Sequence, residues 1–503
     1  TAGDAAFKLY ANADATVHYG QAIAVLNREP GGSAALTEQT TRRLYLNYGR
    51  ALELTQRFDE AIRIYEELYA LGVDSDAPEL ALAALISLAV ITITAAPANE
   101  PKLSEQFAQQ ALELSRRVGD KESEARALWA LFLQGWPKGW GREVIAFGEA
   151  SLAISRELGM QEQTALTSSD LAMAYASVGD LDKMHSTLEE AIILWRQLGN
   201  VPMLANALNV SGMMHMIFGD YEALAAAAVE AYEISKPIGN LWSQLSGAFE
   251  VGSTYLEKAE FDKALVWIEE SAALGNAGRL PFQESLSRAF LAWAYTLLGD
   301  RALALAEART ANMLSKSAAG EILRWIKAIL AMVFIEHDEL DAADRCLEVC
   351  LAAFEPSNLS TPAPLFVFLA KAQRSFAGLE YLQCLQDADD LLQLQNAYQL
   401  QHFRADALAL KAQVLMAIGD HVAAADLLQR AGAKAEALAV RRIRWQILAL
   451  QAQLATGQDQ LQQAEALRAR ARRLVEAIAA DISAEDLREL FLNRTDVKAI
   501  LGS

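Results

Sequence analysis

The sequence predicts an all-α protein, a right-handed superhelical solenoid of about eleven antiparallel helix pairs that repeat roughly every 40 residues. Three observations lead to this prediction. The composition is that of a helical protein, rich in Ala and Leu, with only 11 Pro and 28 Gly among 503 residues. Glycines that follow apolar stretches return at one constant interval. Between them, apolar residues recur at the three- and four-residue spacing of one helix face.

Two series of turn signals alternate along the chain. One series separates the pairs, at Gly119, Gly159, Gly199 and Gly239. The other divides each pair, at Gly179-Asp180, Gly219-Asp220, Ala259-Glu260, Gly299-Asp300, His337-Asp338, Ala377-Gly378 and Gly419-Asp420. Glycine ends a helix in the left-handed conformation without a steric penalty, and the Asp that follows can accept hydrogen bonds from the free amides of the next helix. Each Gly-Asp step therefore predicts a tight turn between two antiparallel helices.

These signals place the helix pairs along the whole chain. We expect pairs near 3–27, 41–71, 78–118, 123–158, 163–198, 203–238, 243–274, 283–317, 321–354, 362–398 and 403–438, then a final long pair at 441–479 and a short capping helix. Two turns are irregular, at 133–144 and at 354–366, and the second contains three prolines. Because a Gln-rich stretch follows it, we place a soft boundary that divides the solenoid into 1–356 and 357–503.

Small and aromatic residues recur at fixed positions within the units. In residues 168–191, Leu171-Ala172 and Tyr175 occupy the first helix, and Met184, Leu188 and Ala191 occupy the second. Small residues lie seven positions before the middle turns, at Ala172, Gly212, Gly252, Ala292, Ala331 and Ala412. This order of large, small and aromatic residues around Gly-Asp resembles the tetratricopeptide (TPR) repeat.

The units are longer than the usual tetratricopeptide unit of about 34 residues, and they end with Leu-Gly-Asn or a similar step rather than with Pro. In this respect the chain resembles the long-repeat C-terminal sensor domains of STAND-type signalling NTPases, such as the maltose-regulon activator. The first residues, 5–26, and the last, 483–501, resemble the segments that begin and end such sensors. The resemblance implies a sensor module that is joined in its parent protein to an upstream NTPase domain.

The bulk composition excludes several classes of partner. A net charge of −20 and a pI near 4.9 make nucleic acid a poor partner, because the surface repels phosphates. Residues 80–98 carry no charge, but they are rich in Ala, Ser and Thr, and we expect a buried helix there rather than a membrane span. Three cysteines and the absence of a leader indicate the cytoplasm. The chain begins at Thr1 rather than Met, so we expect it to be a piece of a longer protein.

No motif predicts catalysis, and we expect a protein that is not an enzyme and has no cofactor. The sequence contains no glycine-rich phosphate loop, and its six histidines are scattered. Cys346 and Cys350 lie on one helix face, where we expect packed thiols rather than metal ligands. The arginines of 440–445 and 467–475 either pair with acids on the same helices or dock an acidic partner or a neighbouring domain.

First helices of a solenoid line its concave side. When the glycine of each middle turn is numbered 15, positions 2, 5, 9 and 12 of the unit face inward. The side chains that we predict to form a binding strip there are Arg126, Trp129, Trp136, Ser169, Met173, Asn206, Asn209, Met213, Met216, Phe249, Ser253, Trp293 and Trp325. The strip has a single charge and several aromatic rings, which suits a protein or peptide, or a neutral small-molecule trigger such as a sugar. Alternatively, longer helices rotate some of these residues into the core.

Two functions agree with these features. In the first, the chain is a non-catalytic TPR module that senses a ligand or protein for a larger STAND-type ATPase and binds its trigger on the concave face. In the second, it is a free-standing TPR scaffold that assembles other proteins. Neither function involves a membrane.

Overall fold

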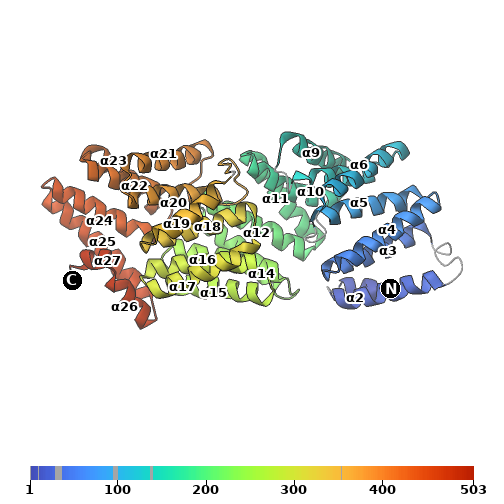
Figure 1. Ribbon diagram of the computed structural model, residues 1–503, viewed down its shortest axis with the longest axis horizontal. Coiled ribbons are helices and arrows are strands. Elements are labelled where there is room, and N and C mark those ends of the chain that lie inside the picture. The colour runs from blue at the N-terminus through green and yellow to red at the C-terminus, as the bar shows by residue number, and fades with distance from the viewer. Residues whose placement is uncertain are drawn as a thin grey trace. The chain divides into compact units, whose positions relative to one another are not determined.

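The computed structural model describes residues 2–8, 11–28, 37–94, 100–135, 140–352 and 354–502. All regular structure in these ranges is helical (Figure 1), which confirms the prediction of an all-α solenoid. The chain divides into two compact units, Thr1–Gly199 and Asn200–Ser503. Each unit is a series of antiparallel helix pairs.

The first unit contains five helix pairs within its described residues. Their bounds are α1 Ala2–Lys8, α2 Asn12–Arg28, α3 Glu38–Leu54, α4 Phe58–Asp74, α5 Pro78–Thr94, α6 Pro101–Val118, α7 Lys121–Phe132, α9 Arg142–Glu157, α10 Gln161–Ser177 and α11 Leu181–Leu198. Every pair lies at the place that the turn signals predict.

The second unit continues the same plan. Its helices are α12 Val201–Phe218, α13 Tyr221–Ser235, α14 Leu241–Glu257, α15 Phe261–Ala277, α16 Pro281–Leu298, α17 Arg301–Leu314, α18 Gly320–Glu336, α19 Leu340–Leu351, α20 Ala363–Ala377, α21 Tyr381–Ala397, α22 Arg404–Ile418, α23 His421–Ala437, α24 Arg441–Gly457, α25 Leu461–Asp481, α26 Glu485–Asn493 and α27 Thr495–Leu501. Two short helices, rather than the single capping helix that we expected, follow the last long pair.

The middle turns have the geometry that the Gly-Asp step predicts. Gly179 has a φ of 74°, and the carboxylate of Asp180 accepts a hydrogen bond from the amide of Lys183 at 3.3 Å. The other Gly-Asp turns repeat this arrangement, with Asp220, Asp300 and Asp420 as caps. Where glycine is missing, the left-handed residue is Ala259, Asp338 or Leu379, with φ between 53° and 61°. The turn therefore stays at the same place in the repeat even where a side chain raises the free energy of the left-handed backbone conformation.

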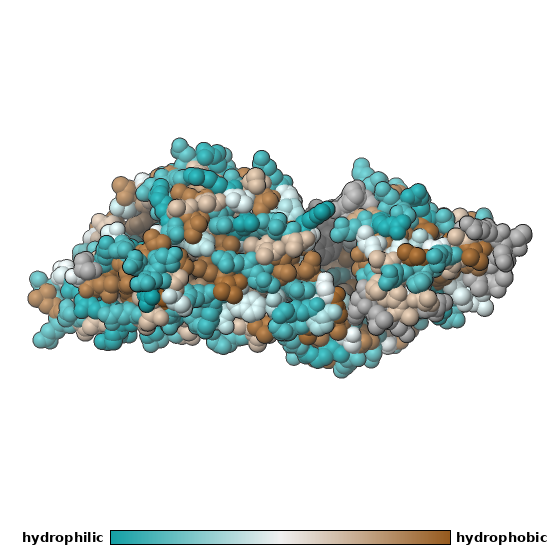
Figure 2. Space-filling model, turned by 90° about the horizontal axis from the view of Figure 1, so that it is seen from below, coloured by the Kyte–Doolittle hydropathy of each residue, from teal (hydrophilic) through white to brown (hydrophobic). Residues whose placement is uncertain are grey.

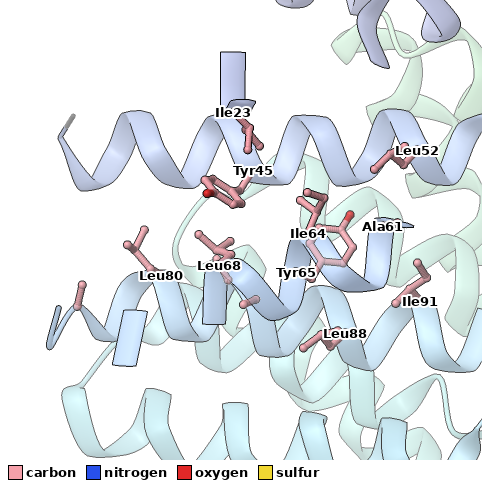
Figure 3. Close-up of a cluster of buried hydrophobic side chains, with 13 residues drawn as sticks. Ile23, Tyr45, Leu52, Ala61, Ile64, Tyr65, Leu68, Leu80, Leu88 and Ile91 are labelled. Carbon is pink, nitrogen blue, oxygen red and sulfur yellow. The ribbon is translucent and has the colours of Figure 1, made fainter. Parts of the chain in front are cut away.

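The core of the first unit lies between successive helices. Figure 3 shows one part of it, where Tyr45 of α3, Tyr65 and Leu68 of α4 and Leu88 of α5 point toward one another. Helix α5 is apolar on every side because it is covered by α4 on one face and by α6 and α7 on another. This confirms the prediction of a buried helix for residues 80–94, while residues 95–98 of the predicted stretch lie outside the described residues. Among the described residues, no helix has the length and apolar character to cross a membrane.

In the second unit, later helices pack on earlier ones after one turn of the superhelix. The C-terminal ends of α12, α14 and α16 carry carbonyl groups without a partner in their own helix. Donors about 180 to 200 residues further along the chain bind these carbonyls. The carbonyl of Ile217 accepts from the amide of Gln401 at 3.1 Å, that of Lys258 from the guanidinium of Arg441 at 2.6 Å, and that of Leu297 from the guanidinium of Arg494 at 2.6 Å.

The soft boundary that we predicted near residue 357 lies inside the second unit, whereas the two compact units divide at Gly199 and Asn200. Helices on both sides of residue 357 share one core, because the ring of Phe366 on α20 lies 5.9 Å from that of Trp325 on α18. The Pro-containing stretch is thus a connection within this unit.

Helices α14 and α15 approach closely at Gly252, so a larger side chain at this position tests their packing. A β-carbon at Gly252 would lie 2.5 Å from Cγ1 of Ile268 and 3.2 Å from the carbonyl of Ala264. We expect Gly252→Leu to lower the free energy of unfolding by about 1–3 kcal/mol, because α14 and α15 must separate. In a solenoid, hydrogen exchange should rise in α12–α17 more than in the first unit.

Gly432 provides a matched control in α23. A β-carbon there would come no closer than 3.4 Å to its neighbours, so Gly432→Leu should change the stability by less than about 1 kcal/mol. Equal losses in both variants would contradict the close approach of α14 and α15.

Candidate functional site

The aromatic residues that we predicted in an open strip are buried in the second unit. Phe249 on α14, Trp293 on α16 and Trp325 on α18 have exposed fractions of 6, 5 and 2%. Their rings pack with Phe366 of α20 and with Phe403 at the start of α22, at centroid distances of 4.6–6.1 Å within this group. The prediction that these three rings lie open is therefore wrong. The reason is that the inner faces of α14 to α22 meet one another, so the superhelix is filled there.

The other strip residues of the second unit are divided between core and surface. Ser253 and Met216 are buried, and so is Asn209, whose amide donates to a backbone carbonyl of α14 at 3.3 Å. These three were also predicted to be open, and the prediction is wrong for them. Asn206 and Met213 of α12 are half-buried and present part of their surface to solvent. The alternative of rotated helices thus holds for most of this strip.

The strip residues of the first unit remain partly accessible. Arg126 and Trp129 of α7 and Met173 of α10 are half-buried, as a ligand contact would require. Ser169 is buried, and its hydroxyl accepts a hydrogen bond at 3.0 Å from the indole of Trp195 on α11. The prediction that Ser169 is exposed is therefore wrong. Trp136 lies outside the described residues. That the accessible residues bind a ligand stays a prediction.

A carboxyl group adjoins these accessible residues. Asp170 of α10 accepts a hydrogen bond from the indole N–H of Trp129 at 2.8 Å. Burial raises the pKa of Asp170 to about 7, and the hydrogen bond from Trp129 opposes that rise. The first unit thus places a carboxyl that titrates near neutral pH beside the predicted strip. The sequence rule missed it because Asp170 holds position 6 of its unit, which the rule does not include.

A buried ion cluster joins the two ends of the superhelical turn in the second unit. Arg442 on α24 donates to Asp406 of α22 at 2.8 and 3.1 Å and to Glu257 of α14 at 3.1 Å. Its guanidinium also lies 5.2 Å from the ring centroid of Trp293 and 5.6 Å from that of Phe403. Because all its partners are buried, this cluster acts as a structural clasp between early and late helices.

Burial changes the protonation of the groups around the clasp. It raises the pKa of Glu257 to about 7, although Arg442 opposes the rise. It lowers the pKa of His402 to about 3, so this histidine is neutral at physiological pH. The neutral ring lies with Nδ1 2.9 Å from the hydroxyl of Tyr221. These groups stabilise the packing of the start of α22 on α13 and of α24 on α14.

The arginines of 440–445 are used within the chain. Arg441 pairs with Asp481 at 2.7 Å, Arg444 pairs with Glu436, and Arg442 forms the clasp. The sequence left two roles open for this stretch, pairing with acids on the same helix or docking of a partner. The structure shows neither: the three arginines bind acids on other helices of the same unit. A sequence pattern could not assign their partners, because Glu257 lies 185 residues away.

An open cavity lies at the C-terminal part of the second unit. Its volume is about 420 Å³, and side chains of α20, α22 and α24 and of the first residue of α23 line it. Figure 1 shows where these helices lie in the second unit. The lining side chains carry no permanent charge. They are Phe376, Gln413, Met416, Ala417, His421, Leu450, Gln453, Leu454 and Gly457. None of these lining residues belongs to the strip predicted from the sequence, because the cavity lies in later helices.

The position rule could have found this cavity. With Gly419 as position 15, Gln413 and Met416 hold positions 9 and 12 of their unit. With the left-handed residues Leu379 and Asp459 as position 15, Phe376 holds position 12 and Gln453 holds position 9. The predicted strip ends at Trp325, whereas the same spacing continues through these later units. The missed signal is therefore the same spacing, continued to the end of the chain.

All three cysteines lie buried in the second unit. Cys346, Cys350 and Cys384 are free and buried, and burial raises the pKa of their thiols to about 11, 12 and 12. Within the described ranges, no cluster of three or more His, Cys, Asp or Glu side chains is arranged to bind a metal ion. The prediction that Cys346 and Cys350 are packed thiols is confirmed.

Comparison with solved structures identifies the fold as a TPR-type helical-repeat solenoid. The Rap protein in complex with competence and sporulation factor matches with a TM-score of 0.51 and 10% identity, over 73% of this chain and all of that chain. Yeast Tom70 has a TM-score of 0.32 and 14% identity, over 93% of this chain and 96% of its own. Human IFIT1 with m7Gppp-AAAA has a TM-score of 0.42 and 14% identity, over 86 and 90% of the two chains. No protein-family model matches the sequence, and no curated protein matches it.

Loss of the clasp arginine should destabilise the second unit. We expect Arg442→Met to lower the free energy of unfolding by about 3–5 kcal/mol, because it leaves the carboxyls of Glu257 and Asp406 buried without their cation. Urea unfolding followed by circular dichroism would measure this. The triple variant with Glu257→Leu and Asp406→Leu should recover much of the loss. A loss below about 1 kcal/mol in the single variant would contradict a structural role for the clasp.

The raised pKa of Asp170 predicts a pH dependence. In the folded state Asp170 keeps its proton up to about pH 7, whereas in the unfolded state it loses the proton near pH 3.8. The contribution of Asp170 to the free energy of unfolding is therefore complete below pH 3.8. Its contribution is lost as the pH rises to about 7, with a slope of up to about 1.4 kcal/mol per pH unit. Asp170→Asn keeps an acceptor for Trp129 and should be more stable than the wild type at pH 8, but not at pH 4. Parallel stability curves between pH 4 and 8 would refute the shift.

Proposed function

We propose that this chain is a non-catalytic recognition module that binds an uncharged segment of a protein or peptide in the cavity of α20, α22 and α24. The observation that carries the proposal is the lining of this cavity, which combines an apolar floor with two glutamine side chains. The tetratricopeptide-type fold supports it, because stacked helix pairs leave an inner surface that can contact an extended ligand.

The lining residues match the chemistry of a peptide. Phe376, Met416 and Leu450 provide an apolar surface for one bulky side chain. Gln413 and Gln453 each provide an amide donor and a carbonyl acceptor, which are the partners that a peptide N–H and C=O require. A charged ligand group would find no permanent opposite charge in the lining.

A non-catalytic role of the cavity is supported by the place of the titratable groups in and near the clasp. Glu257 and His402 are buried between helices, and neither lines the cavity. A catalytic acid or base must reach its substrate within hydrogen-bond distance. Their shifted pKa values are accounted for by burial and by the clasp.

We further propose that the module is the sensor of a larger STAND-type ATPase. The long repeat unit and the two end segments support this role through the resemblance described above. A ligand would shift the balance of the parent protein by binding one of its conformations better than another. Low affinity for nucleic acid stays a prediction from the net charge of −20.

Substitution of the two glutamines tests the proposed site. An array of uncharged peptides with one bulky apolar side chain would provide the probe, and calorimetry would measure the affinity of the best peptide. Gln413→Ala with Gln453→Ala should weaken binding by roughly 10- to 100-fold, because two hydrogen bonds are lost. Gln463→Ala, on the exposed surface of α25, is the matched control and should leave the affinity unchanged.

Two results would contradict this proposal. One is peptide binding that the double variant does not weaken. The other is selective binding of a neutral sugar with no peptide bound at all, which would favour the small-molecule trigger instead.

A further inference from the structure

A row of exposed hydrophobic side chains lies along consecutive turns of the second unit. It comprises Leu379, Leu382, Ile418, Val422 and Leu461, with exposed fractions of 70, 84, 53, 83 and 64%. They belong to the α20/α21, α22/α23 and α24/α25 turns, and Leu382 and Val422 are one repeat apart. We call this row the C-terminal edge. On the face seen in Figure 2, by comparison, hydrophobic residues are interspersed with hydrophilic ones.

The equivalent turns one superhelical turn earlier are covered. Tyr221 and Phe261 are the first residues of α13 and α15, and their exposed fractions are only 4 and 3%. The next residues, Glu222 and Asp262, hold the position of Leu382 and Val422; Glu222 is exposed, and Asp262 accepts a hydrogen bond from the amide of Ser483. The hydroxyl of Tyr221 lies 2.9 Å from Nδ1 of His402, and the ring of Phe261 lies 6.0 Å from that of Phe491. Later segments of the same unit therefore cover this edge of the earlier helices.

The covering segments show which chemistry fits such an edge. They supply aromatic rings, such as that of Phe491, and N–H donors for the carbonyls at the ends of α12, α14 and α16. Two of the donors are arginines, Arg441 at the start of α24 and Arg494 between α26 and α27. The covering surface is thus formed by helix ends that combine apolar side chains with arginine.

The C-terminal edge has the charge that such a surface complements. Each of these turns joins the negative dipole end of one helix to the positive dipole end of the next, so the acidic side chains decide its charge. Three acidic residues, Glu380, Asp420 and Asp459, are exposed in the same turns, beside His421. A second copy that used the same edge would bring acids against acids, so the charges favour a basic partner.

We propose that the C-terminal edge binds an amphipathic helical segment of a partner protein, one that carries leucine or aromatic side chains together with arginine. Such a segment would continue in trans the packing that α22 to α27 make on α12 to α16. The apolar side chains would cover Leu382 and Val422, and arginine would bind the terminal carbonyls and Glu380. This binding does not depend on the cavity or on its peptide.

The test uses the whole chain and a synthetic helical peptide. A fluorescein-labelled amphipathic peptide of Leu, Ala and Arg is the probe, and the same peptide with Glu in place of Arg is its counterpart. Fluorescence anisotropy should show binding of the Arg peptide alone. Leu382→Ser with Val422→Ser should weaken it about tenfold or more, because the apolar contact is lost.

Three variants separate this site from other causes. Val266→Ser on α15 removes a hydrophobic side chain of similar exposure, 65%, and should leave the affinity unchanged. Gln413→Ala with Gln453→Ala should also leave it unchanged, which separates this edge from the cavity. Glu380→Gln should weaken binding, since that residue supplies part of the charge.

Two outcomes would overturn the proposal. Equal binding to all variants would show that the Arg peptide is attracted only by the net charge. Association of the protein with itself in sedimentation, abolished by the Leu382→Ser and Val422→Ser pair, would make a second copy the occupant.

Discussion

The second unit depends on the capping of helix ends by residues one superhelical turn later. An α-helix leaves its last carbonyls without internal partners, and burying them without donors would cost free energy. Here the carbonyls of Ile217, Lys258 and Leu297 receive N–H groups of Gln401, Arg441 and Arg494. The carbonyls lie about one repeat apart, and so do Gln401 and Arg441. Later helices therefore pack in the same way on each of the earlier helix ends. This register brings the inner faces of the first helices together and leaves no room for a groove between them.

The clasp of Arg442 shows how specificity enters a repetitive structure. Hydrophobic contacts between similar helix pairs would permit a shift by one unit, because each pair presents small and apolar residues at the same positions. A buried arginine with Glu257, Asp406 and the rings of Trp293 and Phe403 can be satisfied in one register only. Its contribution to stability is limited by desolvation, whereas its contribution to register is large, as with single polar residues in coiled coils.

The same winding explains where recognition surfaces remain. A solenoid pair is covered by its neighbours and, in this unit, by the pairs of the next superhelical turn. Helices α12 to α16 have such a cover, and their inner residues form a core. The beginnings of α20 and α22 pack in the same core, where Phe366 and Phe403 are buried. The C-terminal parts of α20, α22 and α24 line a cavity instead, and the turns that follow them expose Leu382 and Val422. The cavity and the C-terminal edge therefore belong to the same helix pairs, α20 to α25.

Local order was determined by the sequence alone. The turn at Gly179-Asp180 and its equivalents follow from the freedom of glycine at positive φ and from the capping carboxylate, so helix limits and the repeat could be read directly. The buried or exposed state of Trp293 and Trp325 could not. Both side chains hold positions on the inner face, and that assignment is correct, but only the tertiary structure decided whether the inner face meets solvent or another helix. That choice depends on contacts between residues far apart in the chain, such as Glu257 with Arg442, which no local spacing encodes.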